Sequence, residues 1–212
     1  MKTRSLLAVA GSLAAATFVA ACSGSPAPNP SPSTGAAPSS SQPAKALPYA
    51  GAPKVENPLP ASVLAGDPCD GALTPAQLTE ILNQQPPGKH NDDPSLGPAC
   101  QWPNSETGAL VTVAYTTKVT DGLSTLYANT KPKATVWRPL PLIQGFPAVA
   151  HSTFSQQGSK SFCQVSVGIS DQTTVDVSVG LGETAVGKKD PCDVTTTVAG
   201  MVVTNLRQKA GS

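Results

Sequence analysis

Residues 163–181 read CQVSVGISDQTTVDVSVGL, and this stretch decides the fold. Apolar and polar residues alternate on both sides of a turn at residues 170–173. Side chains of a β-strand point alternately to opposite faces, so the pattern predicts an antiparallel hairpin with one buried face and one polar face. The buried side is expected to carry Cys163, Val165, Val167 and Ile169 from the first strand, and Val175, Val177, Val179 and Leu181 from the second.

A helix is predicted to follow this hairpin. Asp190 and Pro191 are residue types that cap and begin helices. Apolar residues then recur at helical spacing, at Val194, Val198, Met201, Val202 and Leu206. The β-branched residues of this stretch argue weakly against a helix, but the cap and the apolar stripe outweigh that preference.

The clearest helix start lies upstream, at Thr74. Thr74 and Gln77 match a capping box, with Pro75 at the first helical position. Leu73 and Leu78 occupy the two positions of a hydrophobic staple. The sequence therefore predicts a helix that begins at Pro75 and ends before the Pro-Pro-Gly sequence downstream.

Between these two helices the chain is predicted to form further strands and one short helix. Strands are expected at 100–102 and 110–117, joined by a hairpin, and at 148–154. A short helix is expected at 121–129, and the proline-broken segment 136–145 is expected to be irregular. Consecutive strands between helices indicate an α+β fold, in which an antiparallel sheet has helices packed on one face and turns its polar face to solvent or a partner.

The N-terminus carries an export signal. Lys2 and Arg4 precede an apolar run that is too short for a comfortable transmembrane helix. The sequence Val19-Ala20-Ala21-Cys22 resembles the lipobox of bacterial lipoproteins. That resemblance implies a signal peptide at residues 1–21, cleavage before Cys22, and acylation of Cys22 as a membrane anchor. The alternative is an ordinary secretory signal that leaves Cys22 as a free thiol.

Composition divides the remainder into a linker and a domain. Residues 22–66 contain ten of the 22 prolines of the chain and few large apolar residues. Such a segment cannot bury enough surface to offset its ordering entropy, so we expect a disordered tether. Residues 67–212 have the usual length of one domain and are expected to form a single globular unit.

Four cysteines remain after Cys22, an even number that predicts two disulfides in an exported chain. The sequence Asp-Pro-Cys-Asp occurs before both predicted long helices, and Cys-Gln occurs at two strand starts. We favour the nearest pairs, Cys69–Cys100 and Cys163–Cys192, each of which closes a loop of about 30 residues. Cys69–Cys163 with Cys100–Cys192 also joins each helix start to a strand, and the sequence leaves both pairings open. No two cysteines form a C-x-x-C pair, so we predict no zinc site.

Composition also bears on partners. The net charge is +1 and only 13% of residues are charged, so no basic surface for nucleic acid is expected. The same balance argues against an electrostatically held membrane surface. The expected contact with the membrane is the N-terminal lipid anchor, and the further partner is an unidentified envelope protein or small ligand.

Two motifs resemble ligand sites and are interpreted as structural. His90 with Asp92 and Asp93 is a possible cation site, but calcium loops need more oxygen ligands at regular spacing, so we interpret this stretch as a flexible loop. Gly180-Leu181-Gly182 lacks the third glycine and the immediate helix of a phosphate-binding loop, so we interpret it as a turn.

His151 is the one candidate for nucleophilic chemistry, because Ser152, Thr153 and Ser155 lie close to it in the sequence. A serine nucleophile needs an orienting acid and an oxyanion hole, and no G-x-S-x-G elbow is present to hold it. We therefore interpret His151 as structural or exposed and predict no catalytic residue.

The two tryptophans are candidates for the lining of a ligand groove. Trp102 is expected to pack on the disulfide of Cys100. Trp137 lies in a proline-rich segment, where partial exposure and burial are equally expected.

The cysteine and tryptophan framework resembles a family of actinobacterial lipoproteins of unknown function. The residues that carry the resemblance are Asp67-Pro68-Cys69, Leu73-Thr74-Pro75-Ala76-Gln77-Leu78, Cys100-Gln101-Trp102, Cys163-Gln164-Val165 and Pro191-Cys192. The resemblance spans Asp67 to about Arg207, and the lipobox and tether agree with it. It implies a surface lipoprotein of a mycobacterial-type or related high-GC Gram-positive cell, with no established activity, cofactor or catalytic residue.

These observations favour a non-catalytic binding domain without a cofactor, held by lipid on the extracytoplasmic face of the cell membrane. A carrier of a lipid or another hydrophobic ligand is the first alternative, and it requires a cavity between the sheet and its helices. A cell-envelope hydrolase or accessory enzyme is the second alternative, and it requires an acid–base constellation.

Overall fold

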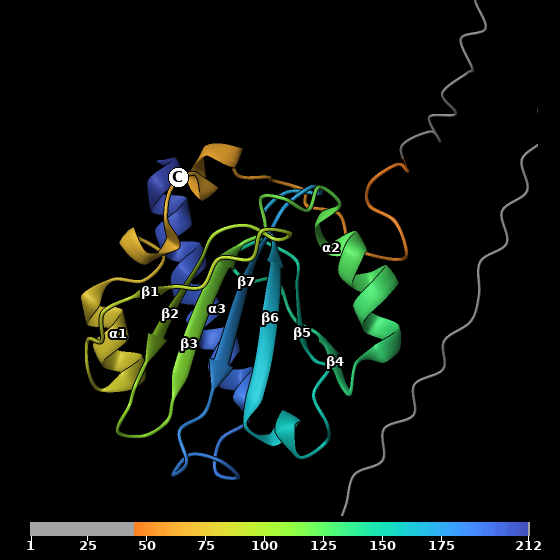
Figure 1. The fold of residues 1–212 in the computed structure, drawn as a ribbon. Helices are drawn as coiled ribbons and strands as arrows, with labels where there is room; N and C mark the ends of the chain where they lie inside the picture. The colour runs from red at the N-terminus through yellow and green to blue at the C-terminus, as the bar shows by residue number, and fades with distance from the viewer. Residues whose placement is uncertain (1–44, 212) are drawn as a thin grey trace, which may run out of the picture. The chain divides into compact units, whose positions relative to one another are not determined.

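The computed structural model describes residues 45–211. They form a seven-stranded antiparallel sheet in the order β1-β2-β3-β7-β6-β5-β4 (Figure 1). The strands are β1 (Lys89–His90), β2 (Ala99–Pro103), β3 (Leu110–Tyr115), β4 (Val136–Pro139), β5 (Ala148–Ser152), β6 (Phe162–Gly168) and β7 (Thr174–Gly180). The helices are α1 (Pro75–Leu82), α2 (Gly122–Thr125) and α3 (Pro191–Ala210). The predicted signal peptide, Cys22 and the first half of the predicted tether lie outside the described residues.

The hairpin of β6 and β7 forms the centre of the sheet, as predicted from its alternating pattern. Val165 pairs with Val177 and Ser166 pairs with Asp176, so apolar and polar pairs alternate along the hairpin. Val165 and Val177 have no exposed surface. The α+β fold class is therefore confirmed, with the apolar face of the central hairpin inside the core.

Helix α3 covers this apolar face and lies behind the sheet in Figure 1. Its side chain Asp190 accepts hydrogen bonds from the backbone N–H groups of Cys192 and Asp193, which satisfies the helix start as predicted. Val198 and Val202 lie in the core with at most 1% of their surface exposed. Burial of such β-branched residues contributes about 1.5–3 kcal/mol each, which outweighs their weak helix propensity.

Both disulfides join a helix start to a strand. They are Cys69–Cys100 and Cys163–Cys192, which are the favoured pairs. The repeated Asp-Pro-Cys-Asp sequence has the same local geometry in both places, because the carboxylates of Asp67 and Asp190 each accept a hydrogen bond from the N–H group two residues later. The alternative pairing that the sequence left open does not occur.

Helix α1 begins with the predicted capping box and lies on the same side of the sheet as α3. Thr74 accepts a hydrogen bond from the backbone of Gln77, and Gln77 accepts one from the backbone of Thr74. Leu78 and Leu82 are buried in the same cluster as Trp102, which is 2% exposed. The prediction that Trp102 packs beside the Cys69–Cys100 disulfide agrees with this arrangement, since all three side chains belong to one core.

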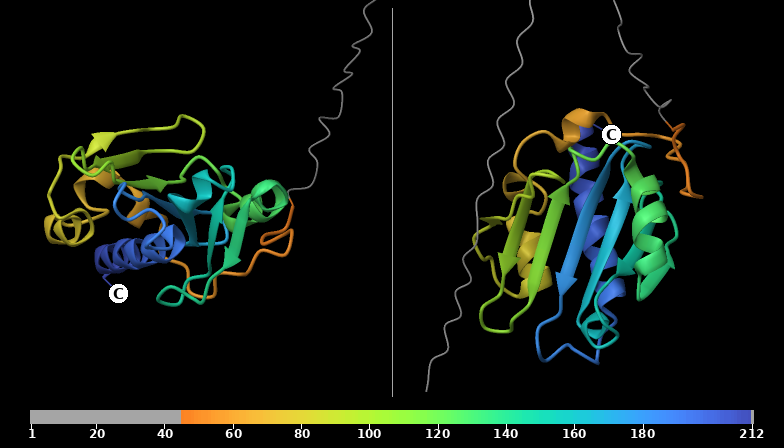
Figure 2. Two further views of the ribbon diagram at one scale, coloured as in Figure 1. Left: turned by 90° about the horizontal axis from the view of Figure 1, so that it is seen from below. Right: turned by 45° about the vertical axis from the view of Figure 1, so that its right-hand side comes forward.

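Helix α2 lies on the opposite face of the sheet, which differs from the expectation that all helices share one face. It continues into the single π-helical turn η3 (Leu126–Thr130), and the two together pass over the β4–β5 side of the sheet (Figure 2). Leu123 forms a second, smaller core with Val149 and Ala52, and Tyr127 packs against it. The sequence showed that this helix is amphipathic but not which face it covers.

The segment expected to be irregular contains strand β4, so that prediction is wrong for residues 136–139. Val136–Pro139 pairs with β5 at the edge of the sheet. A proline lacks the N–H group that a central strand needs, but on an edge strand that group has no partner to lose. The edge position explains why a proline-containing segment can form a strand here.

The packed part of the domain extends upstream of the predicted boundary at Asp67. Val55, Val63 and Leu64 are buried in the main core. Leu59 N–H donates to the carbonyl of Ile169 at 3.0 Å. Prolines limit the freedom of an extended segment before it folds, so a few apolar anchors suffice to hold it.

Within residues 45–211, no helix is both long enough and apolar enough to cross a membrane.

Candidate ligand-binding groove

The face of the sheet opposite α3, here called the open face, carries a row of polar residues. The row runs across five strands through directly paired positions, and its members are Gln101, Thr112, Ser178, Gln164 and His151. A second row crosses beside it through Ala114, Asp176 and Ser166. These residues occupy the polar positions of strands whose other positions fill the core, so the strand period itself builds the polar surface.

Three of these residues form a network that is buried at His151 and Ser166 and partly accessible at Asp176. His151 Nε2 lies 3.1 Å from Ser166 Oγ, and the Ser166 hydroxyl also hydrogen-bonds the Asp176 carboxylate. Asp176 accepts a hydrogen bond from Thr174 Oγ1 at 3.0 Å and one from Gln164 Nε2 at 3.2 Å. When Ser166 donates to the carboxylate, its oxygen accepts from Nε2–H of neutral His151. The network thus ends on a carboxylate that is held by neutral donors.

Burial shifts the two titratable groups of this network in opposite directions. His151 is 5% exposed, and burial lowers its pKa to about 4, so the ring is neutral at physiological pH. Burial raises the pKa of Asp176, and the hydrogen bonds from Ser166, Thr174 and Gln164 offset part of that shift. Asp176 remains partly accessible from the open face.

Two walls rise beside this polar floor. One wall is α2 with η3, and the other is the loop between β1 and β2 that carries Leu96. Gly97 has a φ of +136°, and a Cβ there would collide with the carbonyl of Tyr115, so glycine allows the loop to approach β3 closely. Gly122, with a φ of +49°, likewise lies against the carbonyl of Asp171 at the start of α2.

The floor and walls enclose a groove of about 280 Å³. Its polar floor includes Thr116, Thr174, Asp176, Gln164 and His151, and its apolar lining includes Leu96, Val119, Leu126 and Phe162. An adjoining hollow of about 180 Å³ extends below the β1–β2 loop and shares Leu96, Gln164 and Asp176. The π-helical turn η3 contributes Leu126 and Thr130, and such turns occur frequently at functional sites.

The network resembles a catalytic triad in composition but not in geometry. In a triad the acid orients the histidine and the serine is exposed to the substrate. Here the serine lies between the histidine and the acid, and Ser166 is fully buried in the middle of β6. A substrate carbonyl cannot reach the Ser166 hydroxyl, so the arrangement is suited to holding a polar surface in place rather than to acyl transfer.

The partners of His151 differ from those that the sequence suggested. The Ser152 hydroxyl accepts a hydrogen bond from Ser159 Oγ at 3.1 Å. Ser152 and Thr153 both line the groove. The interpretation of His151 as a structural residue agrees with its burial, but its functional neighbours Ser166 and Asp176 were missed. The available signal was Asp176 itself, an acid within a valine-rich strand, where acidic residues are depleted.

The predicted loop residues near His90 do not converge on a cation site. Asp92 accepts a hydrogen bond from the backbone N–H of Ala99 at 2.9 Å. Asp93 accepts bonds from the N–H and hydroxyl groups of Ser95, which lower its pKa. Both carboxylates therefore shape the loop that forms one wall of the groove.

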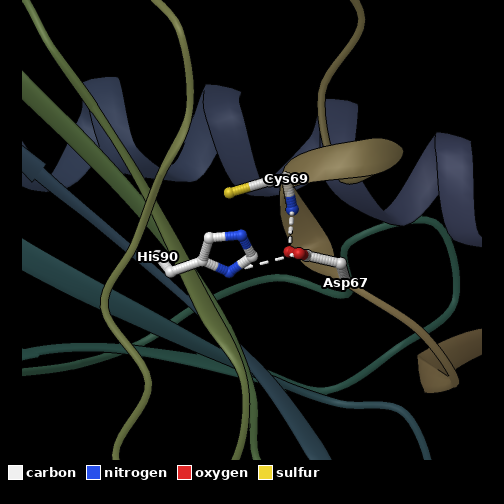
Figure 3. A group of neighbouring side chains, drawn as sticks. All are labelled: Asp67, Cys69 and His90. Carbon is white, nitrogen blue, oxygen red and sulfur yellow. Dashed lines mark hydrogen bonds and ion pairs between the residues drawn. The ribbon is translucent and has the colours of Figure 1, made fainter.

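His90 instead approaches Asp67, and Figure 3 shows these two side chains beside Cys69. His90 Nδ1 lies 3.2 Å from Asp67 Oδ2, and the potential ligand atoms of the three residues lie within 4.8 Å of one another. Cys69 is bonded to Cys100, so its sulfur is not a thiolate and cannot serve as a zinc ligand in the oxidised protein. His90 and Asp67 alone are too few ligands for a metal site.

The remaining candidates do not line the groove. Trp137 is partly exposed, packs edge-on against Tyr127 at 5.0 Å between ring centroids, and lies 6.0 Å from the His151 ring. It therefore supports the back of the network. Gly180 ends β7, and Gly182 follows as part of a turn against Thr107, in agreement with its interpretation as a turn.

Comparison with known proteins identifies the family but not an activity. Among curated proteins and among solved structures, no significant match to this chain is found. The family model described as a protein of unknown function (DUF3558) matches residues 17–205, which includes all seven strands and both disulfides. The chain therefore belongs to the DUF3558 family.

Proposed function

We propose that this protein is a lipid-anchored, extracytoplasmic and non-catalytic binding domain, and that the groove on its open face is the ligand site. The groove carries the proposal, because it combines a few fixed polar groups with apolar walls, which is the usual composition of a small-molecule site. The network of His151, Ser166 and Asp176 holds those polar groups rigidly. A rigid floor loses little entropy when a ligand binds.

The anchor part of the proposal is supported by the lipobox sequence that ends at Cys22. The two disulfides agree with it, because disulfides persist in oxidising extracytoplasmic compartments. The test is intact-mass analysis of the native protein together with detergent-phase partition. Acylated protein should enter the detergent phase, and a Cys22→Ala variant should remain in the aqueous phase. An unmodified N-terminus in the native protein would refute the anchor.

The groove is tested by nuclear magnetic resonance with a chemically diverse set of small fragments. Shift changes should concentrate on amides of the floor, such as Thr174, Gln164 and Thr116. A Thr130→Trp variant should block the groove from the wall of η3. Its matched control is Asn129→Trp, since Asn129 is exposed and does not line the groove. Fragments that bind elsewhere, or that bind Thr130→Trp unchanged, would refute the assignment.

The carrier of a hydrophobic ligand is the alternative function. The acyl chain of a bound lipid would lie between the sheet and α3. Val165, Val177 and Val202 already fill that space and have no exposed surface. Storage there therefore needs the core to separate, which is costly at native packing density. Mass spectrometry of lipids extracted from the purified protein tests this alternative, and one lipid at near-equal molar ratio would favour it over the groove.

A further inference from the structure

The floor of the groove carries a carboxylate that forms no ion pair with a cationic side chain of residues 45–211. The hydrogen bonds to Asp176 come from Ser166, Thr174 and Gln164, which are all neutral. None of the ion pairs found within residues 45–211 includes Asp176. The lining of the groove and of its adjoining hollow contains neither lysine nor arginine.

Some acids of the described chain have basic neighbours although they lie nearer to solvent. Arg138 bonds both Asp190 and Asp193 at 2.9 Å, and His90 lies beside Asp67. Asp176 lies deeper, where a lost hydration shell is more costly to replace. A site that retains such an acid without a paired cation is electrostatically complementary to a positive charge brought by a ligand.

The rest of the groove indicates what carries that charge. Leu126 of η3, Phe162 at the start of β6 and Leu96 of the β1–β2 loop all present apolar surface to the groove. Phe162 also packs against Phe154 in a tilted arrangement, with 4.6 Å between ring centroids, which supports this part of the lining. These side chains suit a hydrocarbon or aromatic group. They do not suit a hydrated metal ion, which needs several oxygen ligands where the groove offers one carboxylate.

We infer that the groove selects a small organic cation, with an ammonium group on the Asp176 carboxylate and an apolar body between Leu126, Phe162 and Leu96. This inference rests on the proposed function, because it names the ligand class of the same groove. Anionic ligands such as fatty acids and phosphates are excluded by the same carboxylate. The volume of about 280 Å³ admits a ligand of about ten non-hydrogen atoms.

Three aromatic probes of similar shape and different charge test the inference. They are phenethylamine, 2-phenylethanol and 3-phenylpropanoate, each titrated into the full chain isolated in a nonionic detergent and followed by amide shifts. Phenethylamine should bind with millimolar affinity and shift the amides of Asp176 and Leu126. The alcohol should bind about tenfold more weakly, since it lacks the charge-assisted hydrogen bond, and the carboxylate should not bind.

Variants separate the charge of Asp176 from the shape of the groove. Asp176→Asn should weaken phenethylamine binding at least about tenfold, whereas the matched control Asp70→Asn, on the exposed surface, should leave it unchanged. Ala114 pairs with Asp176 across β3 and β7, so Ala114→Lys places a built-in ammonium beside the carboxylate. It should abolish amine binding, and Ala114→Gln should not. These two variants retain Asp176, so they test the inference even if Asp176→Asn does not fold.

Each outcome decides one of the two claims. Equal binding of the amine and the alcohol, with no effect of Asp176→Asn or Ala114→Lys, would refute the cation inference. If Thr130→Trp still blocked both probes, the proposed function would stand. Absence of amine binding would refute the cation inference as well. In that case, binding of the fragment set to Thr130→Trp and Asn129→Trp tests separately whether the groove is a ligand site.

Discussion

Acidification should destabilise this protein through His151. The folded state holds the ring neutral because burial lowers its pKa from 6.5 to about 4. A group with a lowered basic pKa contributes stability that is fully present above pH 6.5 and is lost as the pH falls toward 4. Multiplied by 1.36 kcal/mol for each pKa unit, the difference amounts to about 3 kcal/mol of unfolding free energy.

The effects on stability of the groups that face His151 must be separated from the effect of His151 itself. Asp176 is joined to it through Ser166, and Tyr127 and Lys131 approach it by way of Trp137. The raised pKa of Asp176 has the opposite effect on stability. Its contribution to the free energy of unfolding is present at low pH and is lost as the pH rises through its folded-state pKa. Comparison of wild type with His151→Gln at each pH cancels the contribution of Asp176 to first order.

The assay is urea unfolding between about pH 7 and about pH 4, with the disulfides intact. Wild type should lose about 3 kcal/mol more than His151→Gln over this range. His90→Gln is the matched control, since His90 is the other histidine of the chain and lies on the surface. The two variants also assign the two histidine ring signals in proton spectra. A His151 signal that titrates near 6.5, or identical pH profiles for wild type and His151→Gln, would refute the reasoning.

Three further changes test the fold. Gly88→Ala places a Cβ 2.7 Å from Cys100 Sγ and 3.0 Å from Cys69 Sγ, so overpacking against a fixed disulfide should cost about 1–3 kcal/mol in urea unfolding, whereas an unchanged midpoint would contradict the close approach. Thr74→Ala removes the cap of α1 and should cost about 1 kcal/mol, measured in the same way, with the exposed, uncapped position Ala76→Ser as a control that stays within about 0.5 kcal/mol. Replacement of Cys163 and Cys192 by alanine opens a loop with a separation of 29 residues and should cost about 3.5 kcal/mol in the chain-entropy model; a loss below about 1 kcal/mol would show that the unfolded state is already restricted there.

The elements with strong local signals were predictable from the sequence. The hairpin of β6 and β7 follows from strict alternation, and α1 follows from the capping box at Thr74. The disulfide pairs followed from proximity in the chain, although a second pairing satisfied the same rule. In each case the information lies within a few neighbouring residues, where propensity and capping act.

The candidate site was not predictable in the same way. Its network joins His151, Ser166 and Asp176, which come from three strands, and only the register of those strands brings them together. The side of the sheet that α2 covers is likewise set by tertiary packing of Leu123 on Val149. Proline content misled the prediction for β4 and for residues 45–66, because composition does not show whether a proline lies at a sheet edge or in an anchored extended segment.

The most direct test of the central claim is a crystal structure of the protein soaked with phenethylamine. The account predicts density for the ligand in the groove on the open face, with its ammonium group on the Asp176 carboxylate and its ring between Leu126, Phe162 and Leu96. An empty groove at saturating ligand, or a ligand whose ammonium group points away from Asp176 into solvent, would contradict it.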